Sequence, residues 1–544
     1  MKKLLLSTLL LAAAAPLQAQ NEMESFQAFR QNMLNRYEQY RNEMLNRYAD
    51  YLDQVWKDFD QMRPVERFQR PKPSTVPVAK KPDPAPQPQP MPKPTVTPKP
   101  TAPKPTPKPT TPAPKPTTPK PNTPAPKPTP KPTTPKPTPK PTTPANPTTP
   151  ATPAVPVPVV PTVPTVPTPP PAPAPTPAPD RTPKVEVEYY GLQIKLPKVD
   201  IPVSKIGEMG NGNAIKALNN SDFEKKALPA LKEQIKQMQL PDYFQLELVS
   251  HYAKALLPNA GITERANLMH FMLLLCGFDV RPAFEVSTST PVLLIPFEQM
   301  VYARAYFDID GKKYFCFTPD LDKLQGDNMR FRTPSFSSPF DQLHSLDLVI
   351  RKPLKVKGDA QAYTITQGGI TVKGTVNKRL IQMVYKYPQM PVPCYAQSVL
   401  DEDTRQEVEQ QIRSQIGTQA TLTNVNRLLH FVQSGFEYAT DDDQFGFEKP
   451  YFFEELLYYP KCDCEDRSVF YATLLRKVMG VKNHLINFPN HECVSIALPG
   501  EEISGSYYEQ DGLRYYISDP TYIGANTGLC MPQYRSTAPK VEPW

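Results

Sequence analysis

Proline is the residue that most constrains what this chain can fold into. Residues 71–184 contain 47 of the 72 prolines in the 544-residue chain. Because proline lacks an amide hydrogen and has a fixed φ, a segment so rich in it cannot form a packed core. We therefore expect residues 71–184 to be a disordered, Pro/Thr/Lys-rich linker with an extended, polyproline II-like backbone. That leaves residues 185–544 as the part that folds.

The basic charge of the chain also lies in this linker. The formal net charge of the whole chain is +8, whereas residues 71–184 alone carry +13, which leaves −5 for the rest. A mildly acidic globular part does not predict nucleic-acid binding. The basic linker could contact anionic polymers of a cell wall or a membrane surface.

The first twenty residues have the pattern of a secretory signal peptide. Lys2 and Lys3 precede an apolar run from Leu4 to Ala15, and small and polar residues follow it. This run is too short to span a bilayer, and no later segment is long and apolar enough to do so. No cysteine follows the expected cleavage site, so no lipoprotein anchor is expected. We predict an exported protein, periplasmic or extracellular, without a transmembrane segment.

Residues 21–70 contain a repeat of eleven residues. Phe29–Gln39 and Tyr40–Asp50 both contain the sequence Met-Leu-Asn-Arg-Tyr. Eleven residues make about three helical turns, so equivalent apolar side chains form nearly straight rows along one helix. The two rows are Phe26, Tyr37, Tyr48 and Phe59, and Met33, Met44 and Val55.

These rows predict an amphipathic helix over residues 21–70 that must bury its apolar stripe. Our first expectation is a homo-oligomer in which copies of this helix pack as a coiled-coil-like bundle. Docking on the protein's own catalytic domain and binding to a membrane surface are the alternatives.

The chemistry of the chain centres on a cysteine at the start of a predicted helix. Cys464 is followed by two acidic residues and by an apolar run at helical spacing that ends at Gly480. A helix N-terminus favours an anion, and a catalytic cysteine reacts as its thiolate. His491 opens one predicted strand and Asp519 ends another, and adjacent antiparallel strands would bring the two together. This order is that of a Cys-His-Asp triad.

Four features together resemble the transglutaminase-like superfamily, over roughly residues 420–525. They are Cys464-Glu465-Asp466, the helix ending at Gly480, His491 at a strand entry, and Asp519-Pro520-Thr521. The resemblance implies an α+β, papain-like fold, in which a cysteine-bearing helix packs on an antiparallel sheet that carries the histidine and the aspartate. It also implies acyl transfer from an amide, with Cys464 as the nucleophile, His491 as the general base and Asp519 as its orienting partner.

Two positions depart from the family pattern. Cys462 stands where the family usually has glycine, and Cys493 stands where it often has an aromatic residue. Residues two apart in a strand share a face, so Cys493 should lie beside His491. Cys462 and Cys493 are therefore candidate redox neighbours of Cys464. A disulfide within this cluster, or a zinc site made by the three cysteines and His491, are the alternatives. The sequence predicts no cofactor and no resident metal.

An earlier segment parallels this domain at nearly constant offsets. Ile262-Thr263-Glu264-Arg265 corresponds to Cys464–Arg467, and Gly277 corresponds to Gly480. The nucleophile position then holds Ile262 and the aspartate position holds Thr318, and no histidine occurs between His270 and His344. We predict a duplicated fold, with a degenerate lobe at 185–380 and a catalytic domain at 381–544.

Together these features predict an exported, cysteine-dependent enzyme acting on amide bonds of peptide or protein substrates. Hydrolysis is favoured over cross-linking, because nothing in the sequence excludes water as the acceptor. The alternative is a catalytically silent or redox-locked scaffold protein of the cell envelope that keeps the fold without turnover.

Overall fold

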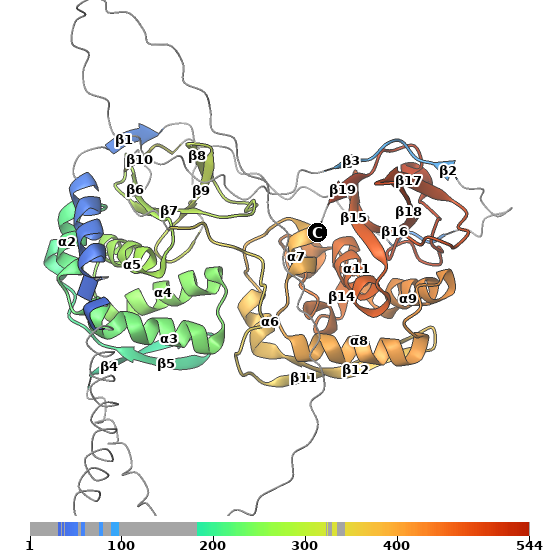
Figure 1. Ribbon diagram of the computed structural model, residues 1–544, viewed down its shortest axis with the longest axis horizontal. Helices are drawn as coiled ribbons and strands as arrows, with labels where there is room; N and C mark the ends of the chain where they lie inside the picture. The colour runs from blue at the N-terminus through green and yellow to red at the C-terminus, as the bar shows by residue number, and fades with distance from the viewer. Residues whose placement is uncertain are drawn as a thin grey trace, which may run out of the picture. The chain divides into compact units, whose positions relative to one another are not determined.

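The computed structural model describes two lobes and parts of the chain that precede them. The described residues are 31–33, 35–36, 38–52, 56–59, 76–79, 89–96, 182–322, 324, 329–334, 343–542 and 544. The predicted signal peptide and most of the predicted linker lie outside them. The architecture is mixed α+β, with curled antiparallel sheets packed against helices (Figure 1).

The first lobe (residues 182–350) consists of a hairpin, a group of helices and a six-stranded antiparallel sheet. The sheet has the strand order β1-β10-β6-β7-β9-β8. Its hairpin and helices are β4 (Lys184–Tyr189), β5 (Leu192–Pro197), η1 (Val203–Lys205), α2 (Gly212–Asn219), η2 (Phe223–Ala227), α3 (Leu228–Met238), α4 (Asp242–Leu256) and α5 (Ile262–Cys276). The sheet strands are β1 (Trp56–Phe59), β6 (Arg281–Glu285), β7 (Pro291–Pro296), β8 (Tyr306–Ile309), β9 (Lys312–Phe317) and β10 (Phe331–Pro334).

The second lobe (residues 360–544) likewise consists of a hairpin, a group of helices and a sheet. Its helices and hairpins are β11 (Ala360–Gln367), β12 (Ile370–Asn377), α6 (Lys378–Val384), α7 (Val392–Gln397), α8 (Glu402–Ile416), α9 (Leu422–Gly435), β13 (Glu437–Tyr438), α10 (Asp441–Gln444), η3 (Glu455–Leu457), β14 (Lys461–Cys462) and α11 (Cys464–Met479). The rest of the lobe comprises β15 (Lys482–Phe488), β16 (His491–Ala497), β17 (Ser506–Gln510), β18 (Leu513–Ser518), η4 (Pro532–Tyr534) and β19 (Lys540–Glu542). The strand order of its sheet is β2-β17-β18-β16-β15-β19-β3, where β2 is Gln89–Pro90 and β3 is Thr95–Val96.

The central strands of the two sheets follow one pattern. In the first lobe α5 leads into the β6–β7 hairpin, and in the second α11 leads into the β15–β16 hairpin. The order β10-β6-β7-β9-β8 then matches the order β19-β15-β16-β18-β17 strand for strand. Both helices end at a glycine in the left-handed conformation, Gly277 with φ 99° and Gly480 with φ 66°. This C-terminal signal was read correctly from the sequence in both lobes.

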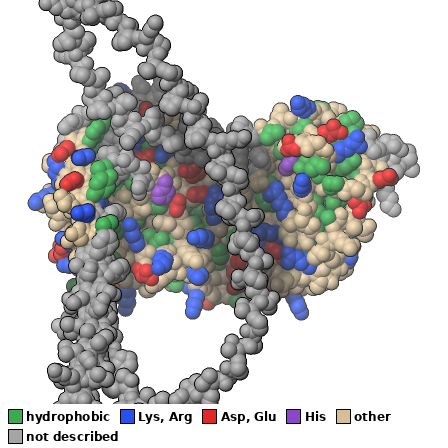
Figure 2. All heavy atoms as spheres, viewed as in Figure 1, with side chains coloured by type: hydrophobic (Ala, Val, Ile, Leu, Met, Phe, Trp, Pro, Cys, Tyr) green, Lys and Arg blue, Asp and Glu red, His purple; other side chains and the backbone are tan. Residues whose placement is uncertain are grey.

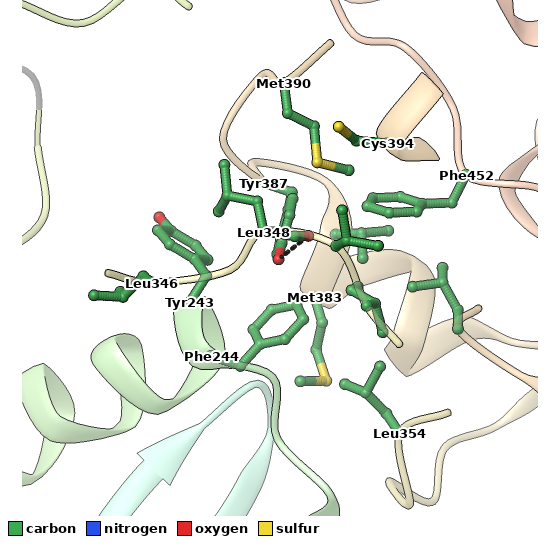
Figure 3. Close-up of a cluster of buried hydrophobic side chains, with 14 of the residues drawn as sticks. Tyr243, Phe244, Leu346, Leu348, Leu354, Met383, Tyr387, Met390, Cys394 and Phe452 are labelled. Carbon is green, nitrogen blue, oxygen red and sulfur yellow. Dashed lines mark hydrogen bonds between the residues drawn. The ribbon is translucent and has the colours of Figure 1, made fainter. Parts of the chain in front are cut away.

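A hydrophobic cluster joins the lobes. Tyr243 and Phe244 of α4 pack on Tyr387, with ring centroids 5.1 and 5.3 Å apart, and Tyr387 also contacts Phe452 (Figure 3). The Tyr387 hydroxyl donates to the carbonyl of Leu348, so its polar end is satisfied inside the cluster. The hairpin β11–β12 packs on α8 and α9, and the expected boundary at residues 380/381 falls inside α6. The second lobe therefore begins earlier than the sequence suggested.

The N-terminal helix docks on the first lobe. The described residues between 31 and 52 are helical, and Leu45, Tyr48 and Leu52 are buried in the same hydrophobic cluster as α5. The Tyr48 hydroxyl lies 2.9 Å from Nε2 of the buried His270. Burial lowers the pKa of His270 to about 3, so this imidazole is neutral near neutral pH.

The predicted helix over residues 21–70 is wrong beyond residue 52. Residues 56–59 form β1, which pairs antiparallel with β10 at the edge of the first sheet. Strand pairing there satisfies backbone groups that an isolated helix end would leave to solvent. Phe26, Tyr37 and Val55 of the predicted rows lie outside the described residues, and self-association of this helix stays a prediction.

The predicted linker also has described structure in places. Residues 76–79 and 89–96 lie on the second lobe, where β2 pairs with β17 and β3 pairs with β19, both in parallel. Lys184 already belongs to β4. A wholly disordered linker over 71–184 is therefore wrong for these residues. Proline is compatible with this pairing because an edge segment need not donate from every residue.

None of the helices in the described ranges is both long and apolar enough to cross a membrane. On the face shown in Figure 2, Lys and Arg side chains are interspersed with Asp and Glu side chains over both lobes.

The docked helix makes a stability prediction. Leu52→Ala should lower the free energy of unfolding by about 2–5 kcal/mol, because Leu52 is fully buried and its loss leaves a cavity. Met33→Ala on the same helix should change it by less than about 0.5 kcal/mol, because Met33 is 51% exposed. Urea unfolding of the full-length protein measures both. Equal effects of the two substitutions would show that the helix does not dock on the first lobe.

Candidate active site

The start of α11 is fixed by hydrogen bonds among its own first residues. Asp463 is the N-cap, and its side chain and that of Asp466 form a reciprocal capping box. The Asp466 carboxylate accepts from the amides of Asp463 at 3.1 Å and Tyr451 at 2.8 Å. Cys464 is thereby held at the first helical position, where the helix dipole favours a negative charge. The sequence predicted this place correctly.

The Cys464 thiol is completely buried. Its sulfur lies 3.3 Å from Oε2 of Glu465, within reach of a hydrogen bond from the thiol to that oxygen. A carboxylate so close opposes a thiolate, since like charges repel strongly in a buried site. For Cys464 to ionise, Glu465 must turn away or a positive charge must compensate for it.

Adjacent strands bring His491 and Asp519 together, as the sequence predicted. His491 is the first residue of β16, and Asp519 directly follows β18, which pairs antiparallel with β16 through Val494 and Ser518. Nε2 of His491 lies 2.7 Å from Oδ2 of Asp519. Both side chains are buried, so the pair is shielded from solvent.

The Asp519 carboxylate is held in place by its other oxygen. Oδ1 accepts from the amides of Thr521 at 2.9 Å and Tyr522 at 3.2 Å. Oδ2 is thus directed at His491 and selects the tautomer with the proton on Nε2. Nδ1 of His491 is buried and has no hydrogen-bond partner among the described residues. That nitrogen is the one left to accept a proton.

A serine joins the cysteine helix to the histidine strand. The Ser468 hydroxyl lies 2.7 Å from the carbonyl of Cys464 and 3.2 Å from that of Glu492, the residue after His491. The first turn of α11 therefore packs directly on the start of β16. The start of α11 thus lies against the strand that begins at His491, next to the strand that Asp519 follows.

Tyr534 covers the histidine. Its ring stacks on His491 with centroids 5.6 Å apart and an angle of 6° between the planes, and on Phe488 at 4.9 Å. Tyr534 belongs to the short helix η4 and is only partly buried. The sequence does not predict Tyr534 as a site residue, because no motif near it marks it as one.

Two further thiols lie near the histidine. The ligand atoms of His491, Cys493 and Asp519 lie within 4.8 Å of one another, so Cys493 shares the face of His491 as predicted. Burial raises the pKa of Cys493 well above its ordinary value, and the charges of Asp519, Cys530 and Cys464 act in the same direction. Burial likewise raises the pKa of Cys530 to about 12. Cys530 was not anticipated from the sequence.

Cys462 makes contacts that the sequence did not predict. Its sulfur accepts from Nε of Arg467 at 3.3 Å and lies 3.6 Å from the carbonyl of Glu437. Burial raises the pKa of Cys462 to about 12, despite the lowering effect of Arg467. Cys462 thus ties β14 to α11, and a guanidinium at its sulfur opposes a zinc ion bound there.

Gln433 supports the site from behind. This fully buried side chain donates to the carbonyls of Asp519 at 3.0 Å and Ala525 at 2.9 Å, and accepts from the amide of Gly524 at 3.0 Å. The backbone carbonyl of Gln433 accepts a hydrogen bond from Nη1 of Arg467 in α11 at 3.0 Å. One residue of α9 therefore links the cysteine helix to the loop that carries Asp519.

The acidic residues beside α11 could in principle hold a cation. Carboxylate oxygens of Asp441, Asp463 and Asp466 lie within 4.8 Å of one another. However, the amide of Lys449 donates to Asp441 at 2.6 Å, and two further amides donate to Asp466. These carboxylates are used to cap and anchor backbone, and the structure gives no reason to assign a metal to them.

No family model, curated protein or solved structure matches this chain.

The support that Gln433 gives can be tested by Gln433→Leu. The carbonyls of Asp519 and Ala525 would lose their donors, at about 1–3 kcal/mol of unfolding free energy each. Alkylation of Cys464 should also slow, because the Asp519 loop is no longer held. Urea unfolding and mapped alkylation rates measure the two effects.

Gln415→Leu is the matched control. Gln415 bonds the backbone of Thr371 through both ends of its amide, far along the chain from the site. This variant should lose stability without a change in the alkylation rate of Cys464. If both variants slow alkylation equally, Gln433 has no special role in the site.

Proposed function

We propose that the second lobe is the catalytic domain of an exported, transglutaminase-like cysteine enzyme that acts on amide bonds of peptides or proteins. Cys464 is the nucleophile, His491 is the general base and Asp519 orients the imidazole. The observation that carries this proposal is the buried pair of His491 and Asp519, which leaves Nδ1 of His491 as the free nitrogen at the end of the sheet where α11 presents Cys464.

The reaction follows from these positions. Nδ1 of His491 takes the thiol proton, and the Cys464 sulfur attacks the amide carbonyl to form a tetrahedral intermediate. The imidazolium, stabilised by Asp519, then protonates the departing amine and leaves a thioester on Cys464. Water releases the acid, or a second amine forms a new amide. The backbone N–H of Cys464 is the candidate donor to the oxyanion.

The repeated strand order supports a duplicated unit with one silent copy. Ile262 is the first residue of α5, as Cys464 is of α11, and Thr318 directly follows β9, as Asp519 follows β18. The first residue of β7, the counterpart of β16, is Pro291. Ile262 has no nucleophile where Cys464 stands, Pro291 has no base where His491 stands, and Thr318 has no carboxylate where Asp519 stands. The first lobe therefore serves as a structural partner.

A silent or redox-locked scaffold is the second candidate. It is favoured by the contact of the Cys464 thiol with Glu465 and by the complete burial of the triad. The neighbouring Cys493 and Cys530 are the thiols that an oxidant would join to the site. In this account the fold and the His491–Asp519 pair persist without turnover.

Alkylation of the reduced, full-length protein separates the candidates. Burial raises the pKa of Cys462, Cys394 and Cys530 to about 12, so these thiols stay neutral and unreactive at about pH 7. An activated Cys464 should instead react with iodoacetamide at that pH, before the other six cysteines. Peptide mass mapping gives the rate at each site.

Two substitutions control this experiment. His491→Gln should slow the reaction of Cys464 by about 10²–10⁴-fold. His484→Gln, on the adjacent strand, should leave it unchanged, because His484 bonds Tyr508 and not a triad residue. If Cys464 reacts equally in both variants, or no faster than the other six cysteines in any folded variant, the enzyme proposal fails and the scaffold account stands.

A further inference from the structure

Three short contacts tie the proline-rich segment to the second lobe. Val78 bridges to Ile523, and the amide of Ala79 donates to the carbonyl of Ile523 at 2.9 Å. The amides of Gln89 and Met91 donate to the carbonyls of Gly505 and Tyr507, both at 2.7 Å. The amide of Thr95 donates to the carbonyl of Pro539 at 3.0 Å. We call residues 89–96 the strap, because its two ends pair with opposite edges of the same sheet (Figure 1).

The strap crosses the end of the sheet that carries the triad. On one edge, β2 pairs with Ser506 and Tyr507 of β17. Tyr507 is in turn paired with Tyr516, near the end of β18 that Asp519 follows. On the other edge, the first residue of β3 pairs with Lys540 of β19, and Lys540 pairs with Asn487 of β15. Asn487 lies one residue from Phe488, the partner of His491 in the β15–β16 hairpin.

One side chain of the strap is buried in the lobe. Met91 is 8% exposed and belongs to the hydrophobic cluster that contains Cys493, Phe488 and Cys530. Its neighbours Pro92 and Lys93 are exposed, and Val96 is 51% exposed. Met91 is thus the anchor of the strap, and it fills space next to the residues that surround His491.

The backbone of the strap shows what kind of extended chain can pair with the sheet edges β17 and β19. We call these two edges the track. The donating amides are those of residues 89, 91 and 95, whereas prolines occupy positions 90, 92 and 94. Every proline therefore falls where the track needs no N–H. Backbone pairing gives such a track affinity for any extended chain, and a side-chain pocket adds selectivity.

The burial of the triad limits how a substrate can reach it. Cys464, His491 and Asp519 are 0, 1 and 2% exposed, so a protein or peptide substrate cannot reach the sulfur in the conformation shown. Access requires that some covering segment moves. The strap is held by two short edge pairings, β2 with β17 and β3 with β19, and by one buried side chain, and a segment held so lightly opens at low free energy.

We propose that the strap occupies the binding track of an extended, proline-tolerant peptide substrate, which displaces it by pairing with β17 and β19 and placing an apolar side chain where Met91 lies. This inference rests on the proposed function of the second lobe and adds to it a substrate class and a built-in inhibitor. The strap leaves and returns as one segment of the same chain, so the enzyme is closed until substrate competes for the track.

The test uses the reduced, full-length protein and iodoacetamide as the probe of Cys464. Met91→Asp places a charge in the apolar anchor site and should raise the alkylation rate of Cys464 by at least about tenfold, by shifting the population toward the open state. Val96→Asp makes the same kind of change at an exposed position of the strap and should leave the rate within about twofold. Thr95→Pro removes the N–H that bonds Pro539 and should act in the same direction as Met91→Asp.

A synthetic peptide then tests the substrate track. Residues 86–98, added to the Met91→Asp protein, should slow alkylation again, and the same peptide with Asp in place of methionine should not. The proposal is overturned if Met91→Asp and Thr95→Pro label like the unaltered folded protein, or if the peptide does not protect the Met91→Asp protein.

Failure of the proposed function gives a different result. In that case Cys464 reacts no faster than the buried thiols in any folded variant, although it reacts fully in denaturant. The strap proposal is then tested by the alkylation rate of Cys493. Met91→Asp should raise this rate, whereas Val96→Asp should not. Equal protection of Cys493 in both variants again overturns the strap proposal.

Discussion

The second lobe depends on the burial of α11. Fourteen of its sixteen residues are buried, including the charged side chains of Glu465, Asp466 and Arg467, so this helix runs through the core and not along a surface. Buried charges are tolerated only when they are paired or hydrogen-bonded. Arg467 meets this condition by donating to Cys462 and to the carbonyls of Gln433 and Phe436. These hydrogen bonds satisfy the buried charge of Arg467. They also hold the first turn of α11, and with it Cys464, in place.

The two lobes show how one arrangement can hold a site or lack it. Each has a long helix, ended by a left-handed glycine, that leads into a hairpin at the centre of an antiparallel sheet. In the second lobe the equivalent positions present a thiol, an imidazole and a carboxylate. In the first they present isoleucine, proline and threonine, and the N-terminal helix packs on that lobe through Tyr48 and Leu52. The first lobe thus keeps the strand order without the three side chains that the second lobe has at these positions.

The features that were predictable from sequence are those specified by local signals. The start of α11 at Cys464, its end at Gly480 and the strands around His491 and Asp519 follow from apolar spacing and from helix-capping residues. The closeness of His491 and Asp519 also followed, because neighbouring antiparallel strands leave few alternatives.

The features that were missed depend on contacts between distant segments. Nothing near Met91 indicates that it packs with Cys493, and nothing near Tyr534 indicates that it stacks on His491. The eleven-residue period predicts that the helix continues through residues 56–59, because the open edge of β10 is not visible in the sequence. Cys462 was grouped with Cys464 by spacing alone, whereas its partner is Arg467. Tertiary pairing overrode the local pattern in each case.

The central claim is that His491 activates Cys464, and the most direct measurement is a pH titration of the thiolate by its ultraviolet absorbance, taken as the difference between the reduced protein and Cys464→Ala. An ordinary cysteine titrates near pH 8.5. The account predicts a transition well below that value, which moves upward in His491→Gln and persists in His484→Gln. A transition at or above about pH 8.5 that is indifferent to His491→Gln would contradict the account, and would leave the lobe as a fold that holds a cysteine without using it.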